Sequence, residues 1–272
     1  MLETYSDNIT ADREGKFKFV ECVTWADDSK RRGGGWQSNW HFDDIPFVGD
    51  GSKESDFDFA YNAKNITAAL PAITDYLSGK DVSGNVMIDT IKGRTASDAA
   101  SKSLALRLLI HFMGDVHQPL HCSDRYTKDK PKGDKGGNDF ALKNHYAANE
   151  LHAVWDNVIY QYHATVHRPF DTAGFADFGK LATELHDSSQ FSKSQIQMID
   201  FGKMADESYK IAVHVYDDLN EGKEEILPDA YISKYAPIAK ERAALAGYRL
   251  AYLIETIFGK SSNSEEQIHF LF

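Results

Sequence analysis

The stretch from His111 to His121, HFMGDVHQPLH, is the feature that most constrains how this chain can fold. It follows a segment that is apolar on nearly all sides and contains Leu104, Leu106, Leu108 and Leu109. A helix with that pattern belongs in the interior of a domain. Burying three histidines and an aspartate with it is costly unless partners satisfy them. The sequence therefore predicts a central buried helix that ends near Pro119 in a polar, functional interior.

A metal ion would satisfy these polar groups better than water or ordinary hydrogen bonds. His111 and Asp115 are four residues apart, and His152 and Asp156 repeat that spacing in LHAVWD. Residues spaced in this way lie on one face of a helix, one turn apart. Imidazole and carboxylate are the ligands that zinc accepts when thiolates are lacking. Any one of these histidines alone would be an ordinary core or surface residue, but together they predict zinc that takes part in chemistry.

Length and charge narrow the class of protein. The 272 residues contain no linker-like stretch and no internal repeat, which predicts one domain over residues 1–272. The 30 basic and 41 acidic residues give a net charge of −11, which argues against broad electrostatic binding of duplex nucleic acid. Three aspartates with two Zn²⁺ ions would still carry a local charge of about +1. A substrate that contains phosphate is therefore compatible with the acidic chain.

Other sequence features bear on the compartment. Cys22 and Cys122 are too few for a disulfide scaffold or a thiolate zinc site, and the sequence leaves open whether they pair or stay free. Apolar runs fall short of the ~18 residues of a membrane span, and the first residues do not form a signal peptide. Asn8 and Asn65 each begin an Asn-Ile-Thr triplet, the acceptor pattern for N-glycosylation.

Helical patterns dominate the chain, and strand patterns are few and short. Thr95 to Asp98 indicates a capping box at the start of the central helix. Asp56 to Leu77 has apolar residues at helical spacing, with a break or kink expected at Pro71. Further helices are expected at 149–162, 191–219 and 229–258, and loops at 33–35 and 125–138. The sequence thus predicts an all-α fold.

Two aromatic-rich segments lie upstream of the histidine-rich stretch. Asp27 ends WAD and His41 begins HFDDIP. On spacing alone, Asp27 would be a helix cap and His41 a surface residue. Together with the other motifs, however, these segments resemble the zinc-dependent single-strand-specific nucleases, also called class I nucleases or 3′-nucleotidases, which are distant relatives of bacterial zinc phospholipase C. The resemblance runs in the family's order through residues 25–27, 41–42, 111–121, 136–138, 151–156 and 246–251.

The resemblance implies a phospholipase C-like or class I nuclease-like helical fold with a zinc cluster in a cleft. By position, one zinc would be held by Asp27, His41, His111 and Asp115. A second zinc would be held by His121, His152 and Asp156. Asp115 would also bridge to a third zinc, and His117 would orient a ligand without binding metal itself.

The same resemblance implies roles in catalysis and substrate binding. The implied catalytic residues are Asp27, Lys30 and Asp115, and the implied substrate-binding residues are Phe42, Asp44 and Asn138. Lys30 would lie near the scissile phosphate, although it could equally be a solvated lysine. Phe42 would stack on a base and Asp44 would bind the edge of that base, with core packing as the alternative for Phe42. Asn138 would lie near the zinc cluster.

The start of the chain departs from the family. There, an N-terminal Trp and a nearby His ligate the third zinc, whereas here the first Trp is Trp25 and the first His is His41. We therefore expect that the chain lacks the family's N-terminal segment, and with it the signal peptide of a secreted or lumenal enzyme. A natural form with two zincs is the alternative.

The function implied is hydrolysis of single-stranded DNA and RNA to 5′-phosphate products, together with removal of 3′-phosphate from nucleotides. Zinc would lower the pKa of water to about 7 and so provide the nucleophile. Single strands would be preferred because a base must unstack to reach an aromatic side chain. A monomer is expected. The alternatives are a zinc phospholipase C and an inactive truncated homologue.

Overall fold

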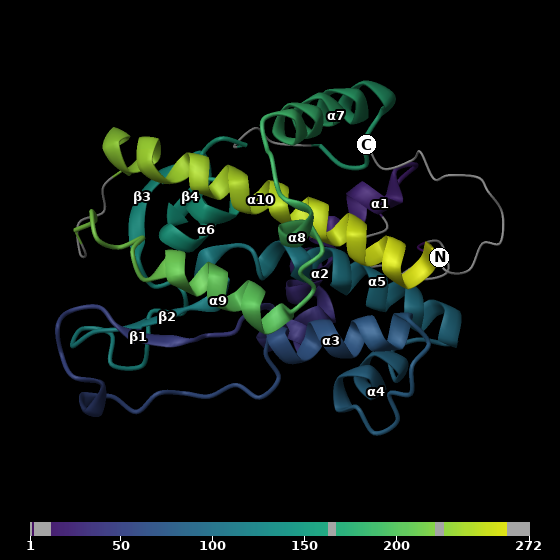
Figure 1. Ribbon diagram of the computed structural model, residues 1–272, viewed down its shortest axis with the longest axis horizontal. Coiled ribbons are helices and arrows are strands. Elements are labelled where there is room, and N and C mark those ends of the chain that lie inside the picture. The colour runs from purple at the N-terminus through teal and green to yellow at the C-terminus, as the bar shows by residue number, and fades with distance from the viewer. Residues whose placement is uncertain (1, 3–11, 163–166, 221–225, 260–272) are drawn as a thin grey trace.

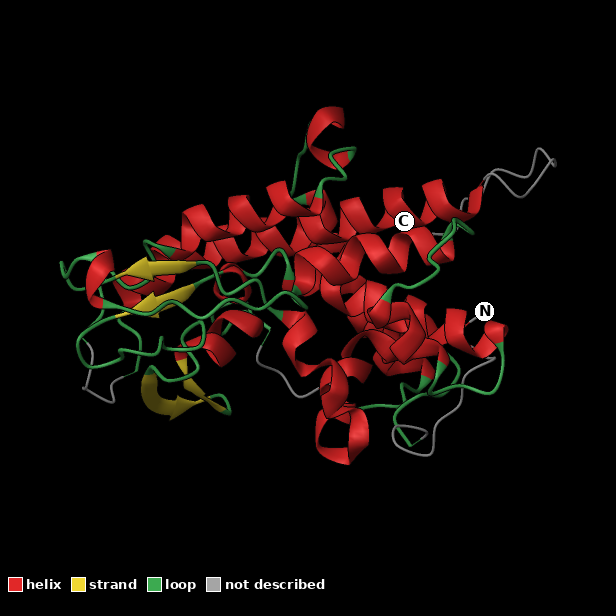
Figure 2. Ribbon diagram, turned by 90° about the horizontal axis from the view of Figure 1, so that it is seen from below, coloured by secondary structure: helices red, strands yellow, loops and turns green. Residues whose placement is uncertain are grey.

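A computed structural model of the protein describes residues 2, 12–162, 167–220 and 226–259, and helices dominate these residues (Figures 1 and 2). The α-helices are α1 (Lys18–Glu21), α2 (Trp25–Ser29), α3 (Ile66–Leu77), α4 (Val86–Lys92), α5 (Asp98–Asp115), α6 (Leu151–Asp156), α7 (Thr172–Asp187), α8 (Lys193–Ile196), α9 (Phe201–Ala212) and α10 (Asp229–Phe258). Short 3₁₀ turns cover Cys22–Thr24, Gly35–His41, Glu54–Asp56 and Pro119–Cys122, and a kinked wider turn covers Lys30–Gly34. The prediction of a helical fold is confirmed.

Two small sheets lie at one end of the helical body, on the left in Figure 1. In the first, β1 (Pro46–Val48) pairs in parallel with β2 (Asp124–Tyr126). In the second, β3 (Ala141–His145) pairs antiparallel with β4 (Ala148–Glu150). The expected loop at 125–138 therefore begins as a strand, which ties it to the segment that follows His41.

Helix α5 is the central element, as its apolar sequence predicts. Leu104, Leu108, Leu109 and Phe112 are fully buried in a core that α5 shares with α3, α4 and the short N-terminal helices. A second core forms around α6 and the first half of α10, which runs across the molecule in Figure 1. The helix cap is Ser97, whose side chain accepts a hydrogen bond from the amide of Ala100, so the capping box expected from Thr95 was wrong.

Side-chain caps account for most of the misplaced helix boundaries. Helix α3 begins at Ile66 because Asn65 caps it, and the residues expected to be helical before it are extended. Their aromatic rings pack on Tyr126 instead. The helix expected at 191–219 is divided into α8 and α9, with Asp200 capping the second. The helix expected at 149–162 ends at Asp156, where a turn follows.

Asn65 is the more informative of the two glycosylation triplets. Its side chain is 9% exposed, accepts a hydrogen bond from the amide of Ala68, and donates one to Asp43. An amide committed in this way is not available to carry a glycan in the folded protein. Asn8 lies outside the described residues.

Both cysteines are free thiols, which settles the question that the sequence left open. Each is fully buried, Cys22 beside the carbonyl of Phe19 and Cys122 beside that of Val116. Burial raises the pKa of the Cys22 thiol to about 12, so this thiol stays protonated. Within the described residues, we also find no helix with the length and apolar character needed to cross a membrane.

Candidate metal centre

The end of α5 brings the histidine-rich stretch into the interior. The helix stops at Asp115, and after a short turn Pro119 opens the 3₁₀ turn that carries His121. Two arginines from α10, Arg242 and Arg249, hold this part of the chain in place. Arg242 donates to the carbonyl of His117 and to Glu207, and Arg249 forms a two-pronged ion pair with the same glutamate.

The first ligand group consists of Asp27 from α2, His41 at the end of its 3₁₀ turn, and His111 from α5. Their ligand atoms all lie within 4.8 Å of one another. Nε2 of His111 lies 3.5 Å from Oδ2 of Asp27, and Nδ1 of His41 lies 3.8 Å from Oδ1 of Asp27. Helices that are distant in sequence thus converge on one point.

The second ligand group consists of His121, His152 and Asp156, the last two from α6. Their ligand atoms also lie within 4.8 Å of one another. The Nε2 atoms of the two histidines are 3.1 Å apart. Oδ1 of Asp156 lies 3.5 Å from Nε2 of His121 and 3.7 Å from Nε2 of His152. This arrangement has the imidazole and carboxylate composition of a zinc site without cysteine.

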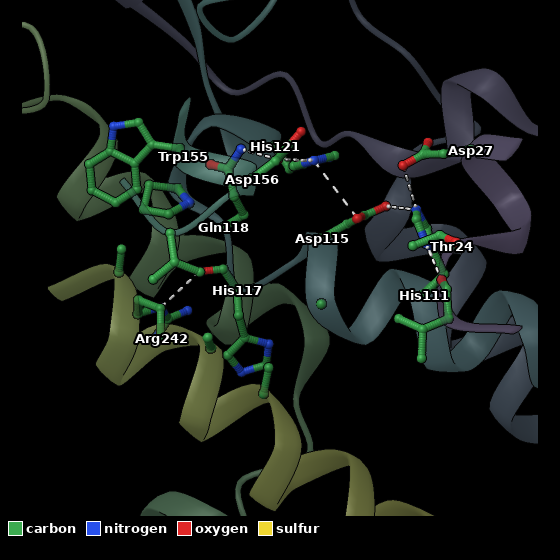
Figure 3. Close-up of a pocket in the computed structure, with 17 residues that line it drawn as sticks. Thr24, Asp27, His111, Asp115, His117, Gln118, His121, Trp155, Asp156 and Arg242 are labelled. Atoms are coloured by element: carbon green, nitrogen blue, oxygen red, sulfur yellow. Dashed lines mark hydrogen bonds and ion pairs between the residues drawn. The ribbon is translucent and has the colours of Figure 1, made fainter. Parts of the chain in front are cut away.

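Asp115 lies between the two groups, as Figure 3 shows. Its Oδ2 is 2.8 Å from Nδ1 of His41 and 3.3 Å from Nε2 of His111. Its Oδ1 is 3.8 Å from Nε2 of His121. One carboxylate therefore faces both groups, although it lies closer to the first.

The groups adjoin a cleft of about 330 Å³. Four side chains of the two groups line it together with Asp115, as do small side chains of α10. The lining includes Asp27, His111, Asp115, His121 and Asp156, together with Ala239, Arg242, Ala243 and Ala246 from α10. The cleft is thus polar beside the ligand groups, and along α10 it is lined by three alanines and Arg242.

Hydrogen bonds fix which nitrogen of each histidine faces inward. Nδ1 of His111 bonds to the carbonyl of Val23, Nδ1 of His121 to that of His41, and Nδ1 of His152 to that of Gly136. A carbonyl can only accept, so each of these Nδ1 atoms carries the proton and each Nε2 presents a lone pair when the ring is neutral. This is the arrangement found behind metal-bound histidines, where an outer partner sets ring orientation and tautomer.

The inward-facing atoms need a cation. In the neutral state, the Nε2 atoms of His121 and His152 would point lone pairs at each other across 3.1 Å. Nε2 of His111 is buried without a hydrogen-bond partner, beside two carboxylates. A buried polar atom left in this way is costly. One zinc ion bound in each group would accept the facing lone pairs of His121 and His152 and the unpartnered lone pair of His111. The residues present therefore fit the metal.

The pKa values of these groups point to the same need. Burial lowers the pKa of His41 to about 4. For His111 and His121 burial acts in the same direction, but the carboxylate of Asp115 and its acidic neighbours outweigh it and raise each pKa to about 9. Burial would raise the pKa of Asp115, yet the surrounding histidines hold it well below its usual range. In each group, one imidazole therefore carries a second proton, and with it a positive charge, when no metal ion is bound.

The predicted catalytic lysine also lies at this centre. Nζ of Lys30 is 2.7 Å from Oδ1 of Asp27 and 5.8 Å from the ring centroid of Phe42. Phe42 is half-buried and stacks on His121, with ring centroids 4.8 Å apart and planes 11° from parallel. Both predicted residues thus contact members of a ligand group.

The other predicted substrate-binding residues are placed differently. Asp44 is partly exposed, has a positive φ of 51°, and has its pKa raised to about 6 by burial and by Asp124. The side chain of Asn138 donates to the carbonyl of Lys135, and Gly136 between them supplies the carbonyl that holds His152. Asn138 therefore belongs to the turn that orients a ligand.

Sequence reasoning was wrong about the ring of His117. Its Nδ1 bonds to the carbonyl of Met113, and its Nε2 accepts from Arg249, so both ring nitrogens are used away from the ligand groups. Two glutamines contact ligands and were not identified beforehand. Gln37 bonds to His41, and Gln118 donates to Asp156. The i,i+4 spacing of Gln37 and His41 was the one signal in the sequence that could have indicated the first contact.

Comparison with known proteins agrees with this geometry. The family model for S1/P1 Nuclease matches residues 2–259. The chain therefore belongs to the S1/P1 nuclease family.

Three individual relatives share 24% to 31% sequence identity with this chain. Endonuclease 4 of Arabidopsis thaliana is 29% identical over 57% of this chain and 50% of its own length. Endonuclease 2 of the same plant is 31% identical over 66% of this chain and 63% of its own length. Nuclease S1 of Aspergillus oryzae is 24% identical over 96% of this chain and 86% of its own length. The chain thus spans about half to two thirds of the length of these two plant relatives.

Proposed function

We propose that this protein is a zinc-dependent phosphodiesterase that hydrolyses single-stranded DNA and RNA. The observation that carries the proposal is the pair of ligand groups, whose inward lone pairs meet beside one cleft with Asp115 between them. Membership of the S1/P1 nuclease family and the names of the relatives support it. Products with 5′-phosphate ends and a 3′-nucleotidase activity are part of the proposal.

In this proposal, the first group with Asp115 and the second group each hold a zinc ion. Bound zinc supplies Lewis acidity toward phosphate oxygens and lowers the pKa of water in the site. The protein's part is to keep the ligands in place before substrate arrives. Carbonyls of Val23, His41 and Gly136 do so by holding the outer nitrogen of their histidines.

Lys30 neutralises negative charge on the reacting phosphate. In the free protein its ammonium group is paired with Asp27, at the edge of the first group. If Asp27 ligated a metal ion, its charge would be shared with that ion, and Lys30 would be free to face an incoming phosphate. A positioned cation of this kind stabilises charge that develops in the transition state.

Phe42 and Asp44 form the proposed base-binding side. One face of Phe42 lies on His121, and the base would stack against its remaining surface. A base held so close to a ligand group must leave its helical stack, which explains a preference for single strands. The neighbouring Asp44 would accept a hydrogen bond from the base edge.

A zinc phospholipase C is the second candidate. It is favoured by one observation, the apolar wall that Ala239, Ala243 and Ala246 give the cleft, which would suit an acyl chain. The proposed nuclease is favoured by Lys30 and Phe42, which contact Asp27 and His121 and suit a nucleotide. Kinship with the family also supports a secreted or lumenal protein, and we propose that it acts as a monomer.

The test is hydrolysis of a single-stranded oligonucleotide, the same sequence as a duplex, and phosphatidylcholine, before and after removal of metal with a chelator. We expect the single strand to be cleaved fastest, to 5′-phosphate ends, with activity lost on chelation and restored by zinc. Faster hydrolysis of phosphatidylcholine would replace the proposal with a lipase. Binding of zinc without hydrolysis of any substrate would indicate an inactive homologue.

A further inference from the structure

Gln37 is a fully buried amide that lies one turn before His41 in the 3₁₀ segment Gly35–His41. Its Nε2 donates to the carbonyl of Ala26 at 2.8 Å. Its Oε1 contacts Nε2 of His41. The amide therefore joins the turn that carries His41 to the helix that carries the next ligand, since Ala26 immediately precedes Asp27.

The two contacts permit one orientation of the amide. The carbonyl of Ala26 can only accept a hydrogen bond, so the nitrogen of Gln37 must face it. The oxygen of Gln37 then faces His41 and can only accept, so Nε2 of His41 must carry a proton. Nδ1 of His41 then faces Asp27 and Asp115, 2.8 Å from Oδ2 of Asp115, and offers its lone pair to a metal ion bound between them.

His41 thereby differs from the other histidines of the two ligand groups. His111, His121 and His152 have Nδ1 held by backbone carbonyls and present Nε2. For His41 the pattern is reversed, and the outer partner is a side chain. A side-chain partner can be changed by substitution, whereas a backbone carbonyl cannot.

We propose that Gln37 is a positioning residue for the first ligand group: it sets the tautomer of His41 and fixes His41 relative to Asp27, so that both meet one zinc ion. The inference rests on the proposed zinc binding. Loss of such an outer partner generally costs about 10- to 100-fold in metal affinity. The second group shares no contact with Gln37 and should keep its affinity.

The experiment compares Gln37→Met with Gln37→Glu, and uses Gln190→Met, at an exposed glutamine, as the matched control. Zinc stoichiometry and affinity are measured by titration against a competing chelator. We expect Gln37→Met to bind one zinc normally and the other about 10- to 100-fold more weakly. Gln37→Glu keeps an acceptor for His41 but loses the donor to the carbonyl of Ala26, so its affinity should lie between those of the wild type and Gln37→Met.

A role in packing alone predicts the opposite ranking. Methionine suits a fully buried position, and a buried glutamate does not. The proposal is therefore overturned if Gln37→Met binds both zinc ions like the wild type. A wild-type chain that binds no zinc would overturn the proposed function and this inference with it.

A measurement on the wild type keeps the test independent of how the variants fold. In ¹⁵N spectra of histidine-labelled, zinc-loaded protein, His41 should carry its proton on Nε2 and bind metal through Nδ1. His111, His121 and His152 should show the reverse. Metal on Nε2 of His41 would contradict the role assigned to Gln37.

Discussion

The two ligand groups have similar chemistry but different surroundings. The first has the ammonium group of Lys30 beside Asp27 and the carboxylate of Asp115 2.8 Å from His41. The second has three side chains of its own, and the nearby Asp44, whose charge interacts with His121, has its pKa raised to about 6, chiefly by burial. A metal site with three protein ligands keeps a position open for water or substrate, and one with four is closed. On the proposed zinc binding, the first group would hold its ion with four side chains, whereas the second would leave a position open for water or substrate.

The two groups are nevertheless linked, first through His41. The side chain of His41 belongs to the first group, while its carbonyl holds Nδ1 of His121 in the second, at 2.9 Å. Asp115 adds a second link. Disturbance of one group should therefore reach the other only when it moves Asp115 or the backbone at His41.

The largest effect is expected for Asp115→Asn, which removes the carboxylate that faces both groups. Both zinc affinities should fall, and kcat/KM on single-stranded DNA should drop by roughly 10³-fold, because several kcal/mol of transition-state stabilisation depend on the metals. Zinc content and kinetics measure it. Asp177→Asn, at a carboxylate whose side chain is 73% exposed, is the control. Loss of zinc from one group alone would show that Asp115 is not shared.

The next test separates the groups. His111→Ala and His152→Ala each remove one inward nitrogen, so each variant should bind one zinc ion instead of two and lose about 10²-fold or more in kcat/KM. Zinc analysis and Co²⁺ spectra show which group survives. His214→Ala, at an exposed histidine paired with Asp217, should change neither. If either substitution empties both groups, they bind metal as one cooperative cluster and the comparison fails.

A smaller effect is expected for Lys30→Met, which alters the charge beside the first group and leaves its ligands intact. The value of kcat/KM on single-stranded DNA should fall roughly 10- to 100-fold, with zinc content unchanged, because a cation near the phosphate is lost. Lys203 forms the same i,i+3 pair with Asp200 on the surface, so Lys203→Met is a matched control. Equal activity of the Lys30 and Lys203 variants would mean that Lys30 is only a solvated lysine.

The helices that were predicted correctly are those whose local pattern of apolar residues is enough to define them. Helix α10 spans Asp229–Phe258 as predicted, because its apolar spacing continues through Pro237. Helix α5 was predicted as buried because no face of it is polar. By contrast, the stretch before α3 has helical spacing but packs Phe57 and Phe59 on Tyr126, which lies 69 and 67 residues away, a contact that periodicity cannot reveal.

The candidate site shows the same division. The histidines and aspartates proposed as ligands lie together. The two i,i+4 pairs and the histidine-rich stretch indicated five of them, whereas Asp27 and His41 were expected only from the resemblance to a known family. The residues that hold them were not found, because a backbone carbonyl such as that of Val23 leaves no trace in a sequence. Gln37 and Gln118 were missed because single amides occur everywhere and only the fold brings them to a ligand.

The smallest expected effect concerns stability beside the second group. Burial and the charge of Asp124 raise the pKa of Asp44 from 3.8 to about 6. A carboxyl with a raised pKa binds its proton more tightly in the folded state, so this group favours folding below about pH 4 and loses that contribution as the pH rises through about 6. Asp44→Asn removes the charge, and asparagine tolerates the positive φ of 51° at this position.

Asp44→Asn should therefore raise Tm above pH 6 by about 2–4 °C, the shift that corresponds to about 1 kcal/mol in a domain of this size. At pH 4 the variant and the wild type should melt together. Asp58→Asn, at an exposed carboxylate in the same loop region, should show no such pH-dependent gain. A Tm gain with weaker binding of single-stranded DNA would show that the acidic surroundings of the second group are kept for substrate at the expense of stability. A gain of equal size at pH 4 would instead assign the effect to backbone conformation, and the contrast in charge between the two groups would lose its support.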